Sequence, residues 1–249
     1  MFIQLFRNEI MKMNSKKQGL YFNAFLILFI GAIGLAIALF SKTTAASMDA
    51  GSFTSLIVMI VPQIVMLFGI VLGAQIVTEE FKDGTVKQLL IRPASRTAVL
   101  LSKYAAVGVM FLFSFIIMLV ASFAIGAGLF GLGGDVTLMD NAMDVFYIFP
   151  FSLFLMTLSF AAGVFTTSLG LSIGIGLFFN VFSSMFGLLA GKYAWSKFVV
   201  LKYTSLAHYV PGSNDPLGIT LGFALGITVI YIAVVVLASI VRFKTKEIN

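Results

Sequence analysis

The stretch of residues 145–191 decides the fold, and it reads VFYIFPFSLFLMTLSFAAGVFTTSLGLSIGIGLFFNVFSSMFGLLAG. Its 47 residues include no Lys, Arg, Asp, Glu or His. One helix needs about 20 apolar residues to cross the hydrocarbon core of a bilayer. The stretch is too long for a single crossing, so it predicts two membrane helices with a break near residues 166–170.

Four other stretches lack charge and are long enough for one crossing each, at residues 18–41, 50–78, 104–134 and 216–241. The sequence therefore predicts an all-α, polytopic membrane protein with six transmembrane helices. We expect residues 1–249 to form a single transmembrane domain, because no hydrophilic segment is long enough to fold by itself.

The composition supports this class. Hydrophobic residues make up 60% of the 249 residues, and the mean hydropathy is +1.07. Charged residues make up only 10%, against roughly 25% in soluble domains. These values exclude a disordered chain and argue against a soluble enzyme. The chain has no Cys and a single His, so it cannot build a disulfide, a thiolate site or a His-cluster metal site.

The basic residues predict the orientation. With the N-terminus inside, cytoplasmic segments hold twelve Lys and Arg residues and outer segments hold four. The positive-inside rule then places both termini in the cytoplasm. This rule accounts for the net charge of +6, and we predict no nucleic-acid partner. A signal peptide cut near residues 45–47 is the alternative for the first helix, but a signal core has only about 7–15 apolar residues.

Residues 1–17 predict an amphipathic helix at the cytoplasmic interface. Apolar side chains recur at helical spacing, and basic ones lie toward the other side, although Glu9 falls on the apolar side. The alternative is a basic leader that only sets the topology.

The loop at residues 78–98 has the most specific local pattern. Asp83 and Gly84 form a turn signal, and Thr85 can cap a short helix over residues 86–91. Pro93 ends that helix, and Ser95 can cap the third membrane helix. Such a short amphipathic helix is suited to docking on a cytoplasmic partner; the alternative is a solvated charged loop.

At these residues the sequence resembles a known family. The order Glu80, Gly84–Thr85, Leu89–Leu90, Pro93, Ser95–Arg96 and Lys103 is similar to the signature of type-2 ABC transporter permeases. These are six-helix subunits with the type V exporter fold. In that family the loop is a coupling helix that fits a groove on a separate ATPase. The resemblance implies that this contact is made by Glu79, Glu80, Gly84, Thr85, Leu89, Pro93 and Arg96.

The resemblance also implies function and partners. It implies a permease subunit of an ATP-driven exporter in the bacterial cytoplasmic membrane, similar to exporters of bacitracin, bacteriocins or peptide toxins. Expected partners are ABC ATPase subunits, a second copy or a sibling permease, the lipid bilayer, and an amphipathic peptide or hydrophobic substrate. The sequence lacks a P-loop, and its nearest approach, at residues 187–192, is one residue short. We therefore expect no enzyme activity and no cofactor in this chain, with ATP and Mg²⁺ bound by the ATPase.

Residues 191–216 form the least regular outer segment. Its aromatic residues Tyr193, Trp195, Tyr203 and Tyr209 favour a membrane interface. The family commonly carries a short re-entrant or interfacial helix at this place, which we expect here; an ordinary loop is the alternative.

Two other functions stay open at this point. An ATP-independent secondary transporter or channel usually has an acidic residue or His within the membrane, and the six predicted spans have none. A membrane immunity protein is the other. Glycine pairs at 69/73, 170/174 and 222/226 permit close helix crossings. Packing within one bundle is the default interpretation, and the resemblance would place the first two pairs near a central path.

Overall fold

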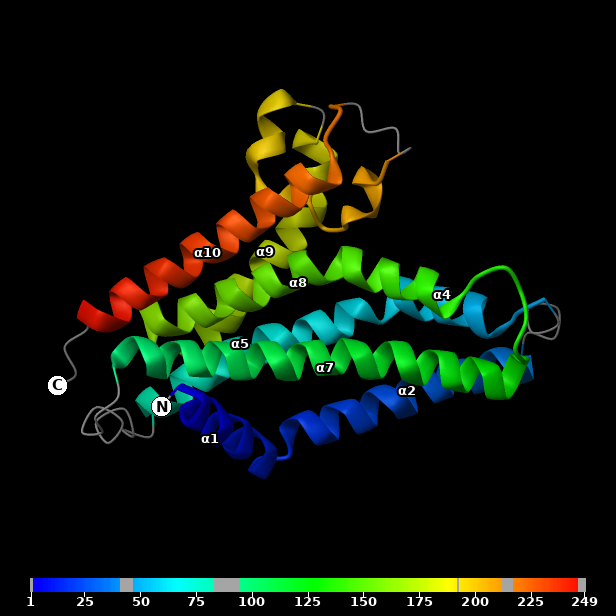
Figure 1. Cartoon of the computed structure of the whole chain (residues 1–249), viewed down its shortest axis with the longest axis horizontal. Coiled ribbons are helices and arrows are strands. Elements are labelled where there is room, and N and C mark those ends of the chain that lie inside the picture. Colours follow the sequence, from blue (N-terminus) through cyan, green and yellow to red (C-terminus); the bar gives the residue numbers. More distant parts are fainter. Residues whose placement is uncertain (1, 41–46, 83–94, 192, 212–216, 246–249) are drawn as a thin grey trace. The chain divides into compact units, whose positions relative to one another are not determined.

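The computed structural model describes residues 2–40, 47–82, 95–191, 193–211 and 217–245. All regular secondary structure in these ranges is helical (Figure 1). Six helices are long and apolar enough to cross a membrane: α2 (Gln18–Phe40), α5 (Pro62–Lys82), α7 (Arg96–Phe130), α8 (Leu138–Thr166), α9 (Leu169–Ala190) and α10 (Leu221–Thr245). The predictions of an all-α fold and of six transmembrane helices are confirmed.

The shorter elements are α1 (Phe2–Ser15), α4 (Ala50–Ile60) and three 3-10 helices, η1 (Ala194–Phe198), η2 (Val200–Lys202) and η3 (Leu206–Tyr209). The predicted N-terminal helix is present as α1. The predicted break in the 47-residue stretch is also present, because α8 ends at Thr166 and α9 begins at Leu169. Between them Thr167 takes a φ of +55°, which turns the chain sharply.

One predicted crossing is divided. Residues 50–78 were expected to form one helix, but α4 ends at Ile60 and α5 begins at Pro62. A proline has no backbone N–H, so it cannot donate to the carbonyl four residues earlier. The crossing is therefore α5 alone, and it extends beyond the uncharged stretch to Glu79, Glu80 and Lys82.

Two other helices also extend across charged residues. α7 begins at Arg96 and includes Lys103, and α8 begins at Leu138 and includes Asp140 and Asp144. Charge alone does not end a helix if the side chain finds a partner or reaches the interface. Ser95 caps α7 as predicted, since its Oγ accepts a bond from Ala98 N at 3.2 Å.

The described chain forms two compact units. The first contains residues 1–10, 66–108 and 147–249, and the second contains residues 11–65 and 109–146. α1, α5, α7 and α8 each contribute residues to both units. We describe each unit separately.

In the second unit small residues permit close helix contacts. A Cβ on Gly34 of α2 would lie 2.8 Å from a methyl carbon of Leu129 in α7. A buried asparagine, Asn141 of α8, joins that helix to α4. Its Nδ2 donates to Gly51 O at 3.1 Å, and its Oδ1 accepts from Ser55 Oγ at 2.9 Å. Such satisfied buried polar groups fix the register between otherwise uniform apolar surfaces.

Asp49 caps α4. Its Oδ1 accepts a 2.8 Å bond from the Ser52 N–H, and the Ser52 Oγ accepts a 3.0 Å bond from the Asp49 N–H. These two bonds form a capping box. The bond from the Ser52 backbone N–H holds the pKa of the Asp49 carboxyl below its usual value.

We expect Asp49→Ala to lower the thermal midpoint of unfolding in mild detergent at neutral pH. Because the native pKa is lowered, the charged cap stabilises the fold above the usual carboxyl pKa, and this contribution is lost as pH falls through the native pKa. The difference in thermal midpoint between the wild-type protein and Asp49→Ala should therefore be smaller in acid than at neutral pH. Asp49→Asn is the matched control, since it keeps the acceptor without the charge. Its loss of stability relative to the wild type should be smaller than that of Asp49→Ala at neutral pH, and it should vanish in acid, where the wild-type carboxyl is also uncharged. A deficit of Asp49→Ala that is the same at both pH values would contradict the role of the charge.

In the first unit, α8, α9 and α10 pack with η2 and η3. One apolar cluster joins α5, α8, α9 and η2 through residues such as Ile70, Phe154, Phe186 and Leu201. Tyr203, Leu206 and Tyr209 form another cluster with Ala224 of α10. The expected re-entrant or interfacial helix at 191–216 is thus a series of 3-10 helices packed against α9 and α10, as the yellow and orange segments of Figure 1 show.

Candidate functional site

A buried ion cluster joins three helices in the first unit. Lys103 of α7 donates from Nζ to Glu9 Oε1 of α1 at 2.8 Å, and it also contacts Glu80 Oε1 of α5. Lys103 is only 2% exposed, Glu80 is 6% exposed and Glu9 is 8% exposed. Such residues are rarely buried unless they are paired, so this cluster is the clearest candidate for a functional arrangement.

The local structure explains why Glu80 needs Lys103. Glu80 lies in the last turn of α5, where the helix dipole disfavours a negative charge. An ammonium group at this place offsets both the dipole and the desolvation of the carboxylate. Lys103 reaches it from the second turn of α7, about 10 Å along that helix from Arg96.

Apolar side chains surround the same helix turns. Val77 and Phe81 lie within three residues of Glu80, and Leu100 and Tyr104 lie within three residues of Lys103. All four belong to one packed cluster with Phe160 and Phe243. The Tyr104 hydroxyl also lies 2.9 Å from Thr157 Oγ1 of α8. Because this environment is poorly polarisable, the ion pairs are strong and the loss of one partner is costly.

Lys103 lies between two acidic side chains. Two carboxylates face one ammonium group, and within the described part of the chain Glu9 Oε2 is buried without a hydrogen-bond donor. Lys103 is therefore the member that links the two carboxylates to each other.

A second tie lies at the start of α7. Arg96 Nη1 donates to the backbone oxygen of Lys244, in the last turn of α10, at 3.0 Å. The carbonyls of a last helical turn have no partner within the helix, so a guanidinium group satisfies one of them.

These ties flank residues 83–94. Glu80 stands just before that segment and is bound to α7 and α1, while Arg96 stands just after it and is bound to α10. Among the sequence-predicted site residues, Glu79 accepts a 2.6 Å bond from Gln75 within α5. Gly84, Thr85, Leu89 and Pro93, and the short helix predicted at 86–91, lie outside the described residues.

Sequence reasoning missed the roles of Glu9 and Lys103. Lys103 was recognised only as part of a motif, and Glu9 only as a misfit on the apolar side of an amphipathic helix. That misfit was the signal, because Glu9 is the buried residue of α1. A charge on the buried face of a helix predicts a buried partner, although it does not identify that partner.

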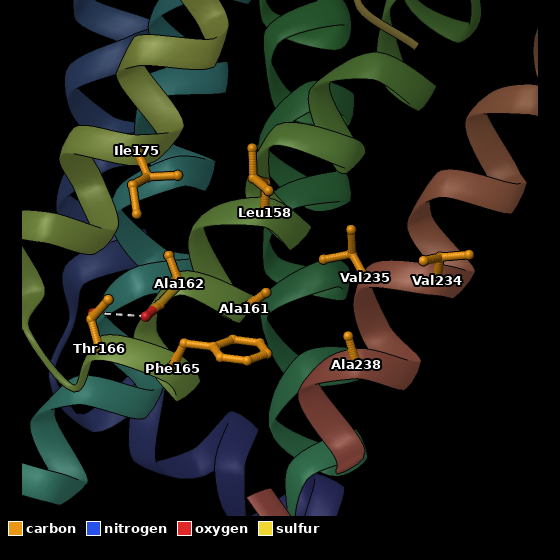
Figure 2. A pocket seen from close by; sticks show the side chains of 9 residues that line it. All are labelled: Leu158, Ala161, Ala162, Phe165, Thr166, Ile175, Val234, Val235 and Ala238. Atoms are coloured by element: carbon orange, nitrogen blue, oxygen red, sulfur yellow. Dashed lines mark hydrogen bonds between the residues drawn. The ribbon is translucent and has the colours of Figure 1, made fainter. Parts of the chain in front are cut away.

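An apolar pocket of about 320 Å³ lies between α8, α9 and α10 (Figure 2). Its lining is apolar apart from one threonine: Leu158, Ala161, Ala162, Phe165, Thr166, Ile175, Val234, Val235 and Ala238. The Thr166 hydroxyl donates to Ala162 O within α8 at 2.7 Å, which is the dashed line in Figure 2. The pocket can therefore bind a ligand through shape complementarity and apolar contacts.

In the described ranges no three acidic or His side chains come together in a way suited to a metal ion. The candidate arrangements are therefore the ion cluster and the apolar pocket.

The fold and the apolar helices define the class as an all-helical, multi-pass membrane protein. The chain belongs to the family described as "Protein of unknown function (DUF2705)", whose model matches residues 20–249. It is also 28% identical over 200 residues to "Uncharacterized protein YhcI" of Bacillus subtilis (strain 168). That alignment covers 73% of this chain and 64% of the relative, so the chain spans less than two thirds of the relative's length.

Proposed function

We propose that this chain is the permease subunit of an ATP-driven ABC exporter in a bacterial cytoplasmic membrane, with both termini in the cytoplasm. It would pair with a second copy or a sibling permease and with separate ATPase subunits that bind ATP and Mg²⁺. The observation that supports this best is that the residues near both ends of the segment 83–94 are bonded to other helices. Glu80 is bonded to Lys103 of α7, and Arg96 is bonded to α10. A segment that receives force from a partner needs such connections to the helices that move.

The connections define a route for that force. A displacement at the end of α5 would reach α7 and α1 through Glu80, Lys103 and Glu9. A displacement at the start of α7 would reach α10 through Arg96. Helices are stiff along their axes, so a shift at their cytoplasmic ends would reach membrane depth.

The proposed cargo is an amphipathic peptide or another hydrophobic compound. The six membrane helices are strongly apolar, and large side chains such as Phe178, Phe182 and Leu188 are exposed on α9. Apolar surfaces of this kind suit a cargo that partitions into the bilayer. Resistance to antimicrobial peptides would be the biological result of their export.

The buried ions favour one other candidate, an ion-coupled secondary transporter. The helices extend beyond the uncharged stretches, so α5 and α7 do contain ionisable residues, and Glu80 and Lys103 among them are buried. Ionisable residues in membrane helices often mark ion pathways. One simple observation distinguishes the two candidates: an ATPase should be purified with an exporter subunit but not with a secondary transporter.

We expect Arg96→Ala to uncouple ATP turnover from transport in the complex reconstituted into vesicles. Lost coupling of this kind typically amounts to 0.5–2 kcal/mol, which corresponds to transport per ATP lower by about 2- to 30-fold. Folding should be retained because Arg96 is bound at an exposed position. A substitution at Gly84 tests the same expectation inside the loop.

Lys244→Ala is the matched control for Arg96→Ala. It removes a neighbouring exposed cation but keeps the backbone oxygen that accepts the Arg96 bond. Coupling should be unchanged in this variant. Equal coupling in all three proteins would count against the loop assignment, and the absence of any ATPase in gentle purifications would count against the exporter.

A further inference from the structure

The hollow between α8 and α10 exists because small side chains face each other there. Ala161 and Ala162 line it from α8, and Ala238 lines it from α10 (Figure 2). An unfilled hollow leaves its lining atoms without dispersion partners. Since Thr166 already uses its hydroxyl within α8, a polar occupant would lose its hydrogen bonds there. The pocket therefore suits a hydrocarbon chain.

The acyl chains of the bilayer lipids are the hydrocarbon chains nearest to this pocket. α10 is among the helices that can cross a membrane, and its outward side chains Val234, Leu237 and Val241 are 58%, 60% and 62% exposed. Val234 also lines the pocket. The pocket is thus continuous with a surface that meets lipid tails in the membrane.

A basic residue, Arg242, lies beyond the pocket toward the end of α10. Arg242 follows Ala238 by four residues and Val235 by seven, so it lies on the same helix face, about 6 Å and 10 Å further along the axis. It is exposed and lies in the last turn of α10. A guanidinium group binds phosphate through two parallel hydrogen bonds.

The helix ends place this cation at the correct depth. Phe165 and Thr166 lie at the end of α8, and three consecutive crossings put the ends of α8 and α10 on the same side of the membrane. The pocket therefore lies in the leaflet whose headgroups are nearest to Arg242. Lys and Arg residues near helix ends attract anionic headgroups.

We propose that this groove is a binding site for an anionic phospholipid, with one acyl chain in the α8–α10 pocket and its phosphate on Arg242. Arg242 accounts for the preference for anionic lipid, and the shape of the pocket accounts for the binding of the acyl chain. The site does not depend on the exporter proposal, because it requires only this chain and a membrane.

The test is native mass spectrometry of the full chain, extracted in mild detergent and titrated with phosphatidylglycerol or phosphatidylcholine of the same acyl chains. The wild-type protein should retain phosphatidylglycerol in preference to phosphatidylcholine. Ala238→Leu and Ala162→Leu should lose the retained lipid because they fill the hollow. Arg242→Gln should reduce the preference for phosphatidylglycerol by about fivefold, as expected for one cation at an anionic surface.

Two variants of α10 are matched controls. Ala233→Leu adds the same bulk at an exposed position that does not line the pocket, and Lys244→Gln removes a cation from another face of the same helix end. Both should retain phosphatidylglycerol like the wild-type protein, and thermal midpoints establish that each variant is folded.

Three results would overturn the proposal. Equal lipid retention in the wild-type and pocket variants would exclude the hollow as the site, and an unchanged preference in Arg242→Gln would exclude the phosphate contact. A change from dimer to monomer in Ala238→Leu with the lipid still bound would identify this face as an interface between two copies.

Discussion

Lys103→Met is expected to destabilise this protein more than any other single substitution of a charged residue in its described part. Met keeps the unbranched length of Lys but removes the ammonium group that faces Glu9 and Glu80. Breaking a buried ion pair by removing one partner typically costs about 3–5 kcal/mol. For a chain of this length that corresponds to a thermal midpoint lower by roughly 10 °C. Fluorescence-detected size exclusion after heating would measure it.

The charge balance supplies a stringent control. Glu9→Gln should cost much less, because it leaves the contact between Lys103 and Glu80 in place. The triple variant Lys103→Met, Glu9→Gln, Glu80→Gln carries no charge at the cluster and should recover most of the lost midpoint. If the triple variant were no more stable than Lys103→Met, the loss would come from packing, and the account based on uncompensated carboxylates would be wrong.

Gly73→Ala is expected to destabilise the first unit by about 1–3 kcal/mol, the usual cost of overpacking. An ideal Cβ on Gly73 of α5 would lie 2.6 Å from the Met156 backbone oxygen and 3.4 Å from the Phe160 backbone nitrogen of α8. Both neighbours are main-chain atoms of a helix, so the helices themselves would have to separate. The thermal midpoint in detergent measures this effect, and Gly73→Leu should enlarge it.

Gly174→Ala is the matched control, since no atom lies within 4 Å of its ideal Cβ. Alanine favours a helix over glycine by about 1 kcal/mol, so this variant should be neutral or more stable. Gly73 therefore serves packing within one chain. Equal effects of the two substitutions would contradict the close contact between α5 and α8.

The long uncharged stretches were sufficient to predict most of the membrane architecture. Spanning helices need apolar length, and no other part of this sequence supplies it. The break after Thr166 and the Ser95 cap followed from local chemistry, because both depend on neighbours within a few residues. The division at Pro62 is also a local effect, because proline lacks the backbone N–H that would continue the helix from α4.

The candidate site was predictable only in part. Glu80 and Arg96 came from the motif, and both proved to be bonded to other helices. The partners of Lys103 lie 94 and 23 residues away in the sequence, and no local pattern connects them. The predicted Ser95 cap already placed Lys103 within α7, but it did not predict that Lys103 is buried; two carboxylates make that burial tolerable.

What the sequence determined by itself was the class of protein: an all-helical membrane protein with six crossings, an N-terminal helix and a capped α7. These depend on apolar length and on neighbours along the chain. Only the tertiary structure decided which helix faces meet, which carboxylates surround Lys103, and where small residues leave a pocket. Helices that are apolar on every side carry little information about their own orientation. That orientation is set by shape and by a few buried polar groups, and these act only between segments that are distant in sequence.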